Sequence, residues 1–173
     1  MLLRIDQFQK LDARMLMDVY AESVLENTEY FFPDEKDKRV AVQKAETGFL
    51  EYLRTGFFTL PGSQYWICEI GGVYVSALRT YRLEPGLYYM EALETHPKYR
   101  RTGYGSGLLA GVEDALRKNG PFRLCSCVSK KNTASLKTHE KSGFRIVSDA
   151  GFDYLSGEAA SRDYGMEYSF HGE

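Results

Sequence analysis

The sequence predicts an α/β sandwich built on a mixed sheet, and the order of its periodic segments carries that prediction. Two helical patterns come first, over residues 11–27 and 38–53. Strand patterns then follow as a meander, with turn signals at "GG" and "EPG". The rest of the chain alternates strand, helix, strand, helix and closing strands. Helices followed by a meander and then by β-α-β-α-β are typical of helices packed on the faces of a mixed sheet.

The first half of the chain changes from helical to strand periodicity near residue 60. Residues 2–6 read as a short strand, and apolar side chains at every third or fourth position predict a helix over 11–27. Pro33 and the charges of "EYFFPDEKDKR" interrupt it, and a second helix is predicted over 38–53, ending near Gly56. The predicted meander strands are "QYWICEI", "VYVSALRTYRL" and "LYYMEALET".

The second half begins with a glycine-rich segment, "YRRTGYGSGLL", that leads into a helix. This helix runs to about Asn119, where Gly120 and Pro121 stop it. A strand, "FRLCSCV", and a helix, "NTASLKTHEKSG", follow. The predicted closing strands are "FRIVSD" and "YGMEYSF".

Length and charge limit the class of protein. We expect one domain over residues 1–173, long enough to bury a core. The 22 basic and 24 acidic residues give a net charge of −2, which offers no reason to expect nucleic acid as the main partner. No stretch approaches the roughly 18 apolar residues of a membrane span, and "MLLRIDQFQKLD" lacks the apolar stretch of a signal peptide. We therefore expect no membrane partner.

The cysteines indicate the compartment. Cys68, Cys125 and Cys127 are odd in number, and two of them alternate along one predicted strand. A cytoplasmic protein with reduced, mostly buried thiols fits this pattern best. No histidine or cysteine lies at the spacing of metal ligands, so we expect no metal site.

The glycine-rich segment is suited to an anion. Unpaired amides and the helix dipole at a helix N-terminus attract negative charge, and glycines let the backbone approach a ligand closely. Arg100 and Arg101 add positive charge. The segment lacks the Gly-Lys-Ser/Thr of a P-loop, and its third glycine, Gly107, comes too early for the dinucleotide-binding fingerprint. Either a phosphate cradle or a plain glycine-rich turn remains open at this point.

Two motifs resemble those of the GNAT superfamily of acyl-CoA-dependent N-acetyltransferases. "HPKYRRTGYGSGLL" resembles its Arg/Gln-x-x-Gly-x-Gly/Ala signature, with Arg100, Gly103 and Gly105 in the fixed positions. "NTASLKTHEKSGF" resembles a second motif, an asparagine followed seven residues later by a tyrosine and then by Gly-Phe; here Asn132 and His139 hold those positions. The resemblance covers nearly the whole chain. It implies a mixed, mostly antiparallel sheet of about six or seven strands flanked by about four helices, with acetyl-CoA as co-substrate.

The resemblance also implies where acetyl-CoA binds. The fourth strand would carry a bulge, and its end, at Leu93, Glu94 and Thr95, would pair like a strand with the pantetheine arm. A bulge there would free an amide for the thioester carbonyl. Strand 122–128 would splay away to open a groove. Asn132 would contact the pantetheine arm, cap the helix that follows it, or do both. The pyrophosphate would bind at Arg100 and the amides that follow it, namely those of Arg101, Thr102, Gly103, Tyr104, Gly105 and Ser106.

Three residues are candidates for the proton transfers. His139 stands where the family has a tyrosine, which the resemblance identifies as the proton donor to the departing thiolate. His139 either takes over this role, or positions a water that donates the proton, or only caps the helix or packs in the core. Glu91 and Glu94 are candidate bases for the amine, on opposite faces unless a bulge intervenes. Glu91 is preferred because it lies deeper in the strand. An ion pair of Glu91 with Arg79 or Arg82, or a water relay without a base, is the alternative.

The predicted function is an N-acetyltransferase that moves an acetyl group from acetyl-CoA directly to a primary amine, on a small molecule or a peptide, in a ternary complex. The alternatives are an acyl-CoA-binding module or sensor of the same fold, and a phosphate binder unrelated to CoA. Tyr30, Phe31 and Phe32 either line the acceptor pocket or pack under a loop. The acidic residues beside them either attract a cationic amine or are a solvated charge run. A homodimer is expected only because it is the commonest oligomer.

Overall fold

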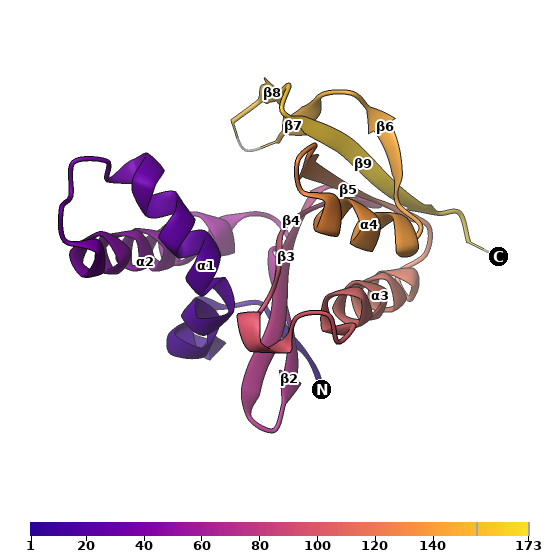
Figure 1. Ribbon diagram of the computed structural model, residues 1–173. Coiled ribbons are helices and arrows are strands. Elements are labelled where there is room, and N and C mark those ends of the chain that lie inside the picture. The colour runs from indigo at the N-terminus through magenta and orange to yellow at the C-terminus, as the bar shows by residue number, and fades with distance from the viewer. Residues whose placement is uncertain (155, 173) are drawn as a thin grey trace.

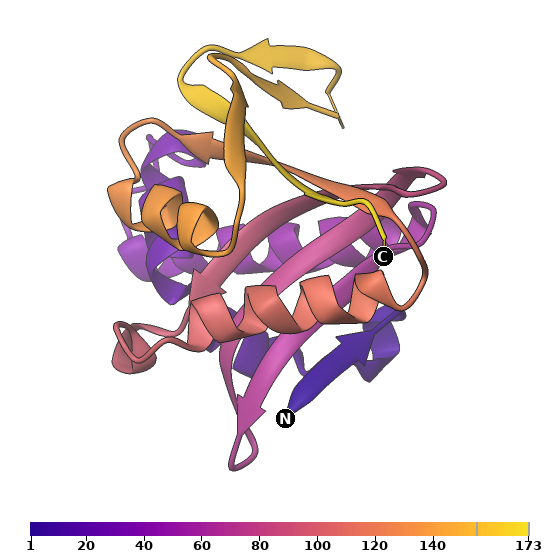
Figure 2. The ribbon, with the colours of Figure 1, turned by 90° about the vertical axis from the view of Figure 1, so that its right-hand side faces the viewer.

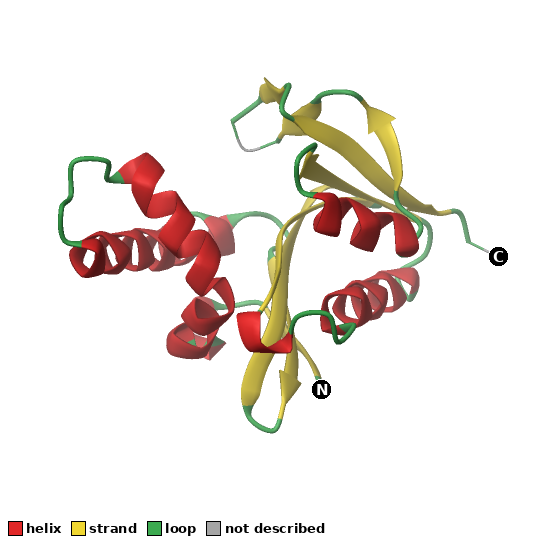
Figure 3. Ribbon diagram, viewed as in Figure 1, coloured by secondary structure: helices red, strands yellow, loops and turns green. Residues whose placement is uncertain are grey.

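A seven-stranded sheet with helices on both faces forms the protein, whose computed structural model describes residues 1–154 and 156–172 (Figures 1 and 3). The described strands are β1 (Leu2–Ile5), β2 (Gln64–Ile70), β3 (Val73–Glu84), β4 (Leu87–Thr95), β5 (Phe122–Ser129), β6 (Arg145–Ser148), β7 (Gly151–Asp153), β8 (Glu158–Ala160) and β9 (Asp163–Phe170). The described helices are α1 (Ala13–Phe31), α2 (Lys38–Thr55), α3 (Tyr104–Arg117) and α4 (Thr133–Lys141), with one-turn 3-10 segments η1 (Phe8–Lys10), η2 (Phe57–Thr59) and η3 (Pro97–Tyr99).

The sheet has the order β1-β2-β3-β4-β5-β9-β6 and is antiparallel except between β4 and β5. The predicted mixed, mostly antiparallel sheet is therefore confirmed. The parallel pairing of β4 with β5 stops at Met90 opposite Ser126, although β4 continues to Thr95 and β5 to Ser129. The two strands part beyond that point, as the resemblance implied.

Two apolar cores hold the layers together, one on each face of the sheet. On one face, α1 and α2 pack Leu16 and Leu53 against Tyr65. On the other face, α3 crosses the strands and packs Leu109 against Leu78 (Figure 2). Each of these side chains is fully buried, and such burial stabilises the fold by about 1.5–3 kcal/mol per large apolar side chain. The α1–α2 layer and the α3–α4 layer are thus fixed to the same strands.

A β-bulge changes the direction of the side chains near the end of β4. Ala77 of β3 lies opposite Glu94 and Arg79 lies opposite Glu91, so Leu78 alone faces two residues of β4. One of these two, Ala92, has a φ of +56°, which is rare for a residue with a side chain. Because paired residues share a face, Glu91 and Glu94 both point to the α1–α2 side. Regular alternation, which would have separated them, does not hold here.

The helix ends follow local sequence signals. Asp12, Asp37 and Asn132 cap α1, α2 and α4, each accepting a hydrogen bond from an amide of the first turn. Helix α1 continues to Phe31, beyond the predicted end at residue 27. It ends there because the residue before a proline, here Phe32, is disfavoured in helical conformation. The β7–β8 hairpin was not predicted, because its strands are too short to show a period.

Membrane and metal features are missing from the part of the chain that the structure describes. No helix of residues 1–154 and 156–172 is both long and apolar enough to cross a membrane. The same residues contain no group of three or more His, Cys, Asp or Glu side chains that could hold a metal ion. The three cysteines are free thiols; Cys125 is buried, and Cys68 and Cys127 are half-buried.

Candidate active site

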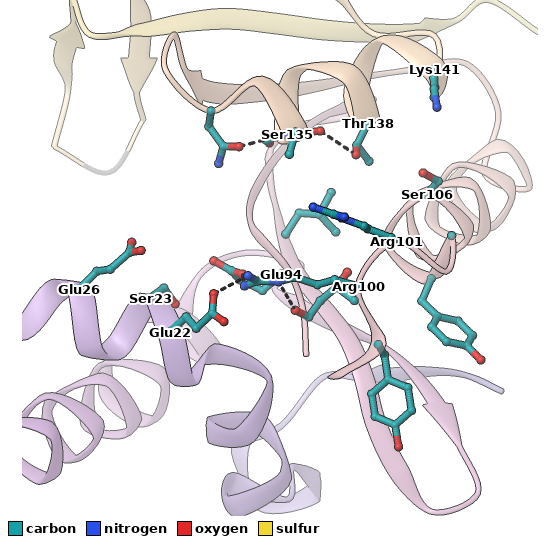
Figure 4. Close-up of a pocket in the computed structure, with 18 residues that line it drawn as sticks. Glu22, Ser23, Glu26, Glu94, Arg100, Arg101, Ser106, Ser135, Thr138 and Lys141 are labelled. Carbon is teal, nitrogen blue, oxygen red and sulfur yellow. Dashed lines mark hydrogen bonds and ion pairs between the residues drawn. The ribbon is translucent and has the colours of Figure 1, made fainter. Parts of the chain in front are cut away.

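A groove of about 780 Å³ lies between α1, the end of β4, the start of α3 and α4 (Figure 4). The bulge and the parting of β4 from β5 place these four segments around one opening. Helices on both sides contribute polar side chains: Glu22, Ser23 and Glu26 from α1, and Ser135, Thr138 and Lys141 from α4. The groove is thus polar along both walls.

The start of α3 forms one end of the groove. Helix α3 begins after Gly103, whose φ of +86° is left-handed, and no described side chain caps it. The amides of its first turn are therefore left for solvent or a ligand, and the helix dipole adds partial positive charge. Arg101 points into the groove below Thr138, and Lys141 points down from α4 (Figure 4). This end is suited to a polyanion such as a pyrophosphate.

Close packing holds the start of α3 against β4. A Cβ at Gly105 would lie 3.0 Å from Thr95 Oγ1, so a side chain there would require the Thr95 side chain to move. Arg100 adds a polar link, because its Nε donates to the Thr95 carbonyl at 3.3 Å and its Nη1 is ion-paired with Glu22 of α1. A second nitrogen, Nη2, lies 3.8 Å from the carboxylate of Glu94. Arg100 therefore connects β4 to α1, and carboxylates already match its charge.

The residues predicted to bind the co-substrate come together in this groove. It is lined by Leu93, Glu94, Thr95, Arg100, Arg101, Gly103, Tyr104, Gly105, Ser106 and Asn132. Thr102 is the exception, since its hydroxyl turns back to donate to the Tyr99 carbonyl. Their binding roles stay predictions. The polar walls from α1 and α4 were missed, although the helical spacing of Ser135, Thr138 and Lys141 was a signal that one face of α4 is polar.

Beyond the groove, a small cavity of about 150 Å³ opens where β4 and β5 part. Leu93, Asn132 and Ser135 line both spaces, so the two adjoin. The side-chain oxygen of Asn132 accepts from the Ser135 amide at 3.0 Å. The capping role considered for Asn132 is therefore present, at a position that also faces the groove.

His139 is buried in the wall of this small cavity. Its ring is 2% exposed, packs edge-on against Phe144, and places Nδ1 2.8 Å from the Ser135 carbonyl. A carbonyl only accepts, so Nδ1 carries the proton of the neutral ring, and Nε2 faces the Ser126 hydroxyl at 3.3 Å. Burial lowers the pKa of His139, which favours the neutral ring. The neutral ring therefore has no free N–H, and its acid role stays a prediction.

Glu91 is held in an ion pair. Its Oε1 accepts from Nε of Arg79 at 2.7 Å, and both side chains are largely buried. The guanidinium of Arg79 also lies over the rings of Phe49, Tyr52 and Phe57, at 5.3–5.6 Å from their centroids. The ion pair considered as an alternative for Glu91 is thus formed, with Arg79 rather than Arg82.

Glu94 occupies a different environment three residues later. Its side chain lines both the groove and a further cavity between α1 and α2, as does Ser23. Burial, opposed by Arg100, raises the pKa of the Glu94 carboxyl, and Glu26 and Glu22 raise it further. A carboxyl with a raised pKa at the meeting point of two cavities is suited to exchanging protons with a ligand.

The further cavity has a volume of about 650 Å³ and is called the aromatic cavity below. It is lined by Tyr20, Ser23, Val24, Asn27, Phe31, Phe32, Lys44, Ala45, Gly48, Phe49, Tyr52, Arg79, Ala92 and Glu94. Phe31 and Phe32 were predicted either to line a pocket or to pack under a loop, and both line this cavity. Tyr30, the third of that cluster, is 80% exposed and lies outside the lining, with its ring edge-to-face against that of Phe31.

Tyr20 ties the aromatic cavity to the bulge. Its hydroxyl donates to the Ala92 carbonyl at 2.7 Å and accepts from the Tyr65 hydroxyl at 3.0 Å. Both tyrosines are buried. This chain of hydrogen bonds connects α1 to the residue with the positive φ, so it helps to hold the bulge that aims Glu94.

Comparison with known proteins agrees with the arrangement of these elements. The family model described as "Acetyltransferase (GNAT) family" matches residues 13–144. This match includes α1, α2, the bulge, the glycine-rich segment and α4. A comparison with curated protein sequences gave no match.

Several solved structures share the fold. PaiA N-acetyltransferase from Thermoplasma acidophilum, in complex with coenzyme A, is 16% identical with a TM-score of 0.65; the match covers 98% of this chain and 99% of that chain. IAA acetyltransferase from Bacillus cereus is 15% identical with a TM-score of 0.62, covering 98% and 99%. The yncA protein from Salmonella typhimurium, with its cofactor acetyl-CoA, is 18% identical with a TM-score of 0.62, covering 100% and 95%.

Proposed function

The chain belongs to the acetyltransferase (GNAT) family, and from that premise we propose that it acts as one domain that transfers an acetyl group from acetyl-CoA to a primary amine. The observation that carries the proposal is the junction at Glu94. There a groove with an uncapped helix start meets a cavity of acceptor size. Acetyl-CoA supplies an acetyl group on a thioester. The new bond joins the amine nitrogen to the acetyl carbon, and the bond from that carbon to sulfur breaks.

The groove residues fit acetyl-CoA. The first-turn amides of α3, with Arg101 and Lys141, would hold the pyrophosphate. Leu93 and Asn132, which line both the groove and the small cavity, would hold the pantetheine arm. Positioning of the thioester beside the amine supplies much of the rate in such a reaction.

Glu94 would accept the proton that the amine loses. An alkylamine has a pKa of about 10.4, so it is mostly protonated at neutral pH and needs a base. The sequence favoured Glu91 for this role, but the pair with Arg79 occupies that carboxylate. Glu94 faces both cavities, and its raised pKa brings it closer to the working pH.

His139 would contribute the proton for the departing thiolate only in its protonated form. Nε2–H would then donate to the Ser126 hydroxyl, which lines the small cavity with it. Because burial lowers the pKa of His139, this contribution should grow as the pH falls below neutral.

A second function is an acyl-CoA-binding module that does not transfer the acetyl group efficiently. The observation that favours it is the commitment of the His139 Nδ1–H to the Ser135 carbonyl, which leaves the neutral ring without a proton to donate. Both functions need the same groove, so binding of CoA does not separate them.

The experiment that separates them is release of the CoA thiol from acetyl-CoA in the presence of primary amines. The acetyltransferase predicts release that depends on the amine and that falls in Glu94→Gln while acetyl-CoA still binds. Binding of acetyl-CoA without amine-dependent release, across small amines and lysine peptides, contradicts the transferase and supports the binding module.

A further inference from the structure

The aromatic cavity has walls suited to an apolar body. Rings of Phe31, Phe32, Phe49 and Tyr52 come from α1, the loop after it and α2, and with Tyr20 they surround the space. Phe31 lines this space and is also 62% exposed. Flat apolar groups pack well against such rings.

Most charges around this cavity are already neutralised. Arg79 is 9% exposed and paired with Glu91, and Lys44 is paired with Glu35 at 2.6 Å. Glu94 is the lining carboxylate at the end shared with the groove, and Arg100, which is closely paired with Glu22, approaches it only to 3.8 Å. Glu94 is thus the one place for a cation among the described lining residues. Elsewhere the lining is rich in rings, with a few scattered polar atoms such as the unpartnered Tyr52 hydroxyl and Arg79 Nη1. A ligand with several ammonium groups would bury charges without counter-charges there.

Gly48 keeps this cavity open. It lies inside α2, where glycine lowers helix stability relative to alanine. Its φ is not in the left-handed range, and a Cβ built on it meets no atom within 4 Å. Neither backbone conformation nor close packing therefore requires glycine at this position. On the helix it lies on the same face as Ala45 and Tyr52, which line the cavity with it.

We propose that the acceptor is a primary amine carried on an aromatic or similarly flat apolar group, and that Gly48 sets the size of the group admitted. The amine lies at Glu94, and the flat group lies among the rings against the backbone of Gly48. This inference rests on the proposed acetyl transfer, whose acceptor it specifies. A Cβ at Gly48 meets open space, so a larger side chain there has room to extend into the cavity.

The test compares two amines that differ in the ring, 2-phenylethylamine and ethylamine, with spermidine as a polar polyamine. Wild-type protein should use 2-phenylethylamine with the highest kcat/KM of the three. Gly48→Leu should lower kcat/KM for 2-phenylethylamine by about tenfold or more, through KM, and leave ethylamine within about twofold. Thr47→Leu is the matched control, because Thr47 is the neighbouring exposed residue of α2 and lies outside the lining. Equal melting temperatures of the variants exclude misfolding.

Two results overturn the inference while leaving acetyl transfer intact: a preference for spermidine or ethylamine over 2-phenylethylamine, or unchanged kinetics of Gly48→Leu. Absence of CoA release with every amine overturns the proposed function instead. In that case calorimetric titration of the CoA-loaded protein with 2-phenylethylamine tests whether the aromatic cavity binds such an amine. Binding that is weakened in Gly48→Leu and kept in Thr47→Leu supports the proposed ligand, and absence of binding rejects it.

Discussion

The groove and the aromatic cavity are of similar size, about 780 and 650 Å³, but different parts of the chain build them. One end of the groove consists of backbone amides and charged side chains from the consecutive residues around Gly103. The aromatic cavity consists of side chains from α1, α2, β3 and β4, far apart in the sequence. A site made of backbone tolerates most side-chain changes except at its glycines. A site made of side chains can change its ligand with a single substitution.

Glu94 and Ser23 line both spaces, so chemistry is expected where the two kinds of site meet. Substitutions at this junction, or at the residues that support it, should therefore change the rate of acetyl transfer. Substitutions at residues with a structural role should change stability instead.

The largest effect is expected for Glu94→Gln. Loss of the base should lower kcat with a good amine by about 10²-fold or more, with little change in acetyl-CoA affinity. In the wild type, kcat/KM should fall on the acid side with an apparent pKa above 4.5, the ordinary value of a glutamate, because the pKa of Glu94 is raised. The pH profiles of both proteins check this. A full rate in Glu94→Gln would remove Glu94 from the chemistry.

Glu91→Gln should act on stability more than on the chemical step. It leaves the buried Arg79 guanidinium without its counter-charge, which costs about 3 kcal/mol of unfolding free energy for a buried pair. Urea denaturation of both variants compares the loss of unfolding free energy in Glu91→Gln with that in Glu94→Gln. Should Glu91→Gln keep its stability and lose its rate, the roles of the two glutamates would be reversed.

Tyr20→Phe tests the link between α1 and the bulge. The variant leaves the Ala92 carbonyl without its donor and the Tyr65 hydroxyl without its acceptor, at a cost of about 1–3 kcal/mol. We expect lower kcat from looser placement of Glu94, with unchanged acetyl-CoA binding. The control, Tyr65→Phe, keeps the bond to Ala92 and should keep kcat. Equal loss of kcat in both variants would contradict the account of the bulge.

The smallest effect concerns His139 and pH. Its folded-state pKa is lowered, so below about pH 6.5 the unfolded chain binds more protons than the folded protein. The contribution of the neutral ring is therefore present above that pH and is lost as the pH falls, by up to about 1.4 kcal/mol per pH unit. The difference in unfolding free energy between wild type and His139→Gln, followed from pH 8 to 5, should show this slope. A flat difference would mean that the buried ring is not held neutral.

The groove was predictable from sequence because its signals are local. Gly103 and Gly105 are adjacent to the residues they serve, and the resemblance of the two motifs to the GNAT superfamily implied the groove beside strand 122–128. Asn132 was correctly considered as a cap for the same reason. Thr102 is the one predicted binding residue that does not line the groove. Its hydroxyl donates instead to the carbonyl three residues earlier, a contact that rotamer and turn geometry decide.

The aromatic cavity and the choice between the glutamates were not predictable in the same way. The cavity depends on where α1 and α2 stand relative to each other, and Gly48 looks like any helix glycine until its open surroundings are seen. The facing of Glu91 and Glu94 depends on a bulge at Ala92, and the hydroxyl of Tyr20, from another element, helps to hold that bulge by donating to the Ala92 carbonyl. Long-range contacts of this kind leave no periodic signal.

The most direct test of the account is calorimetric titration of the protein with acetyl-CoA, beside Gly103→Asp and Gly72→Asp. Both glycines have a positive φ and open space around a built Cβ, but Gly72 lies in the β2–β3 turn outside the groove. We predict one-site binding to the wild type and to Gly72→Asp, weakened at least about tenfold in Gly103→Asp by the negative charge at the start of α3. No binding to the wild type, or equal binding to all three proteins, would contradict the assignment of this groove to acetyl-CoA.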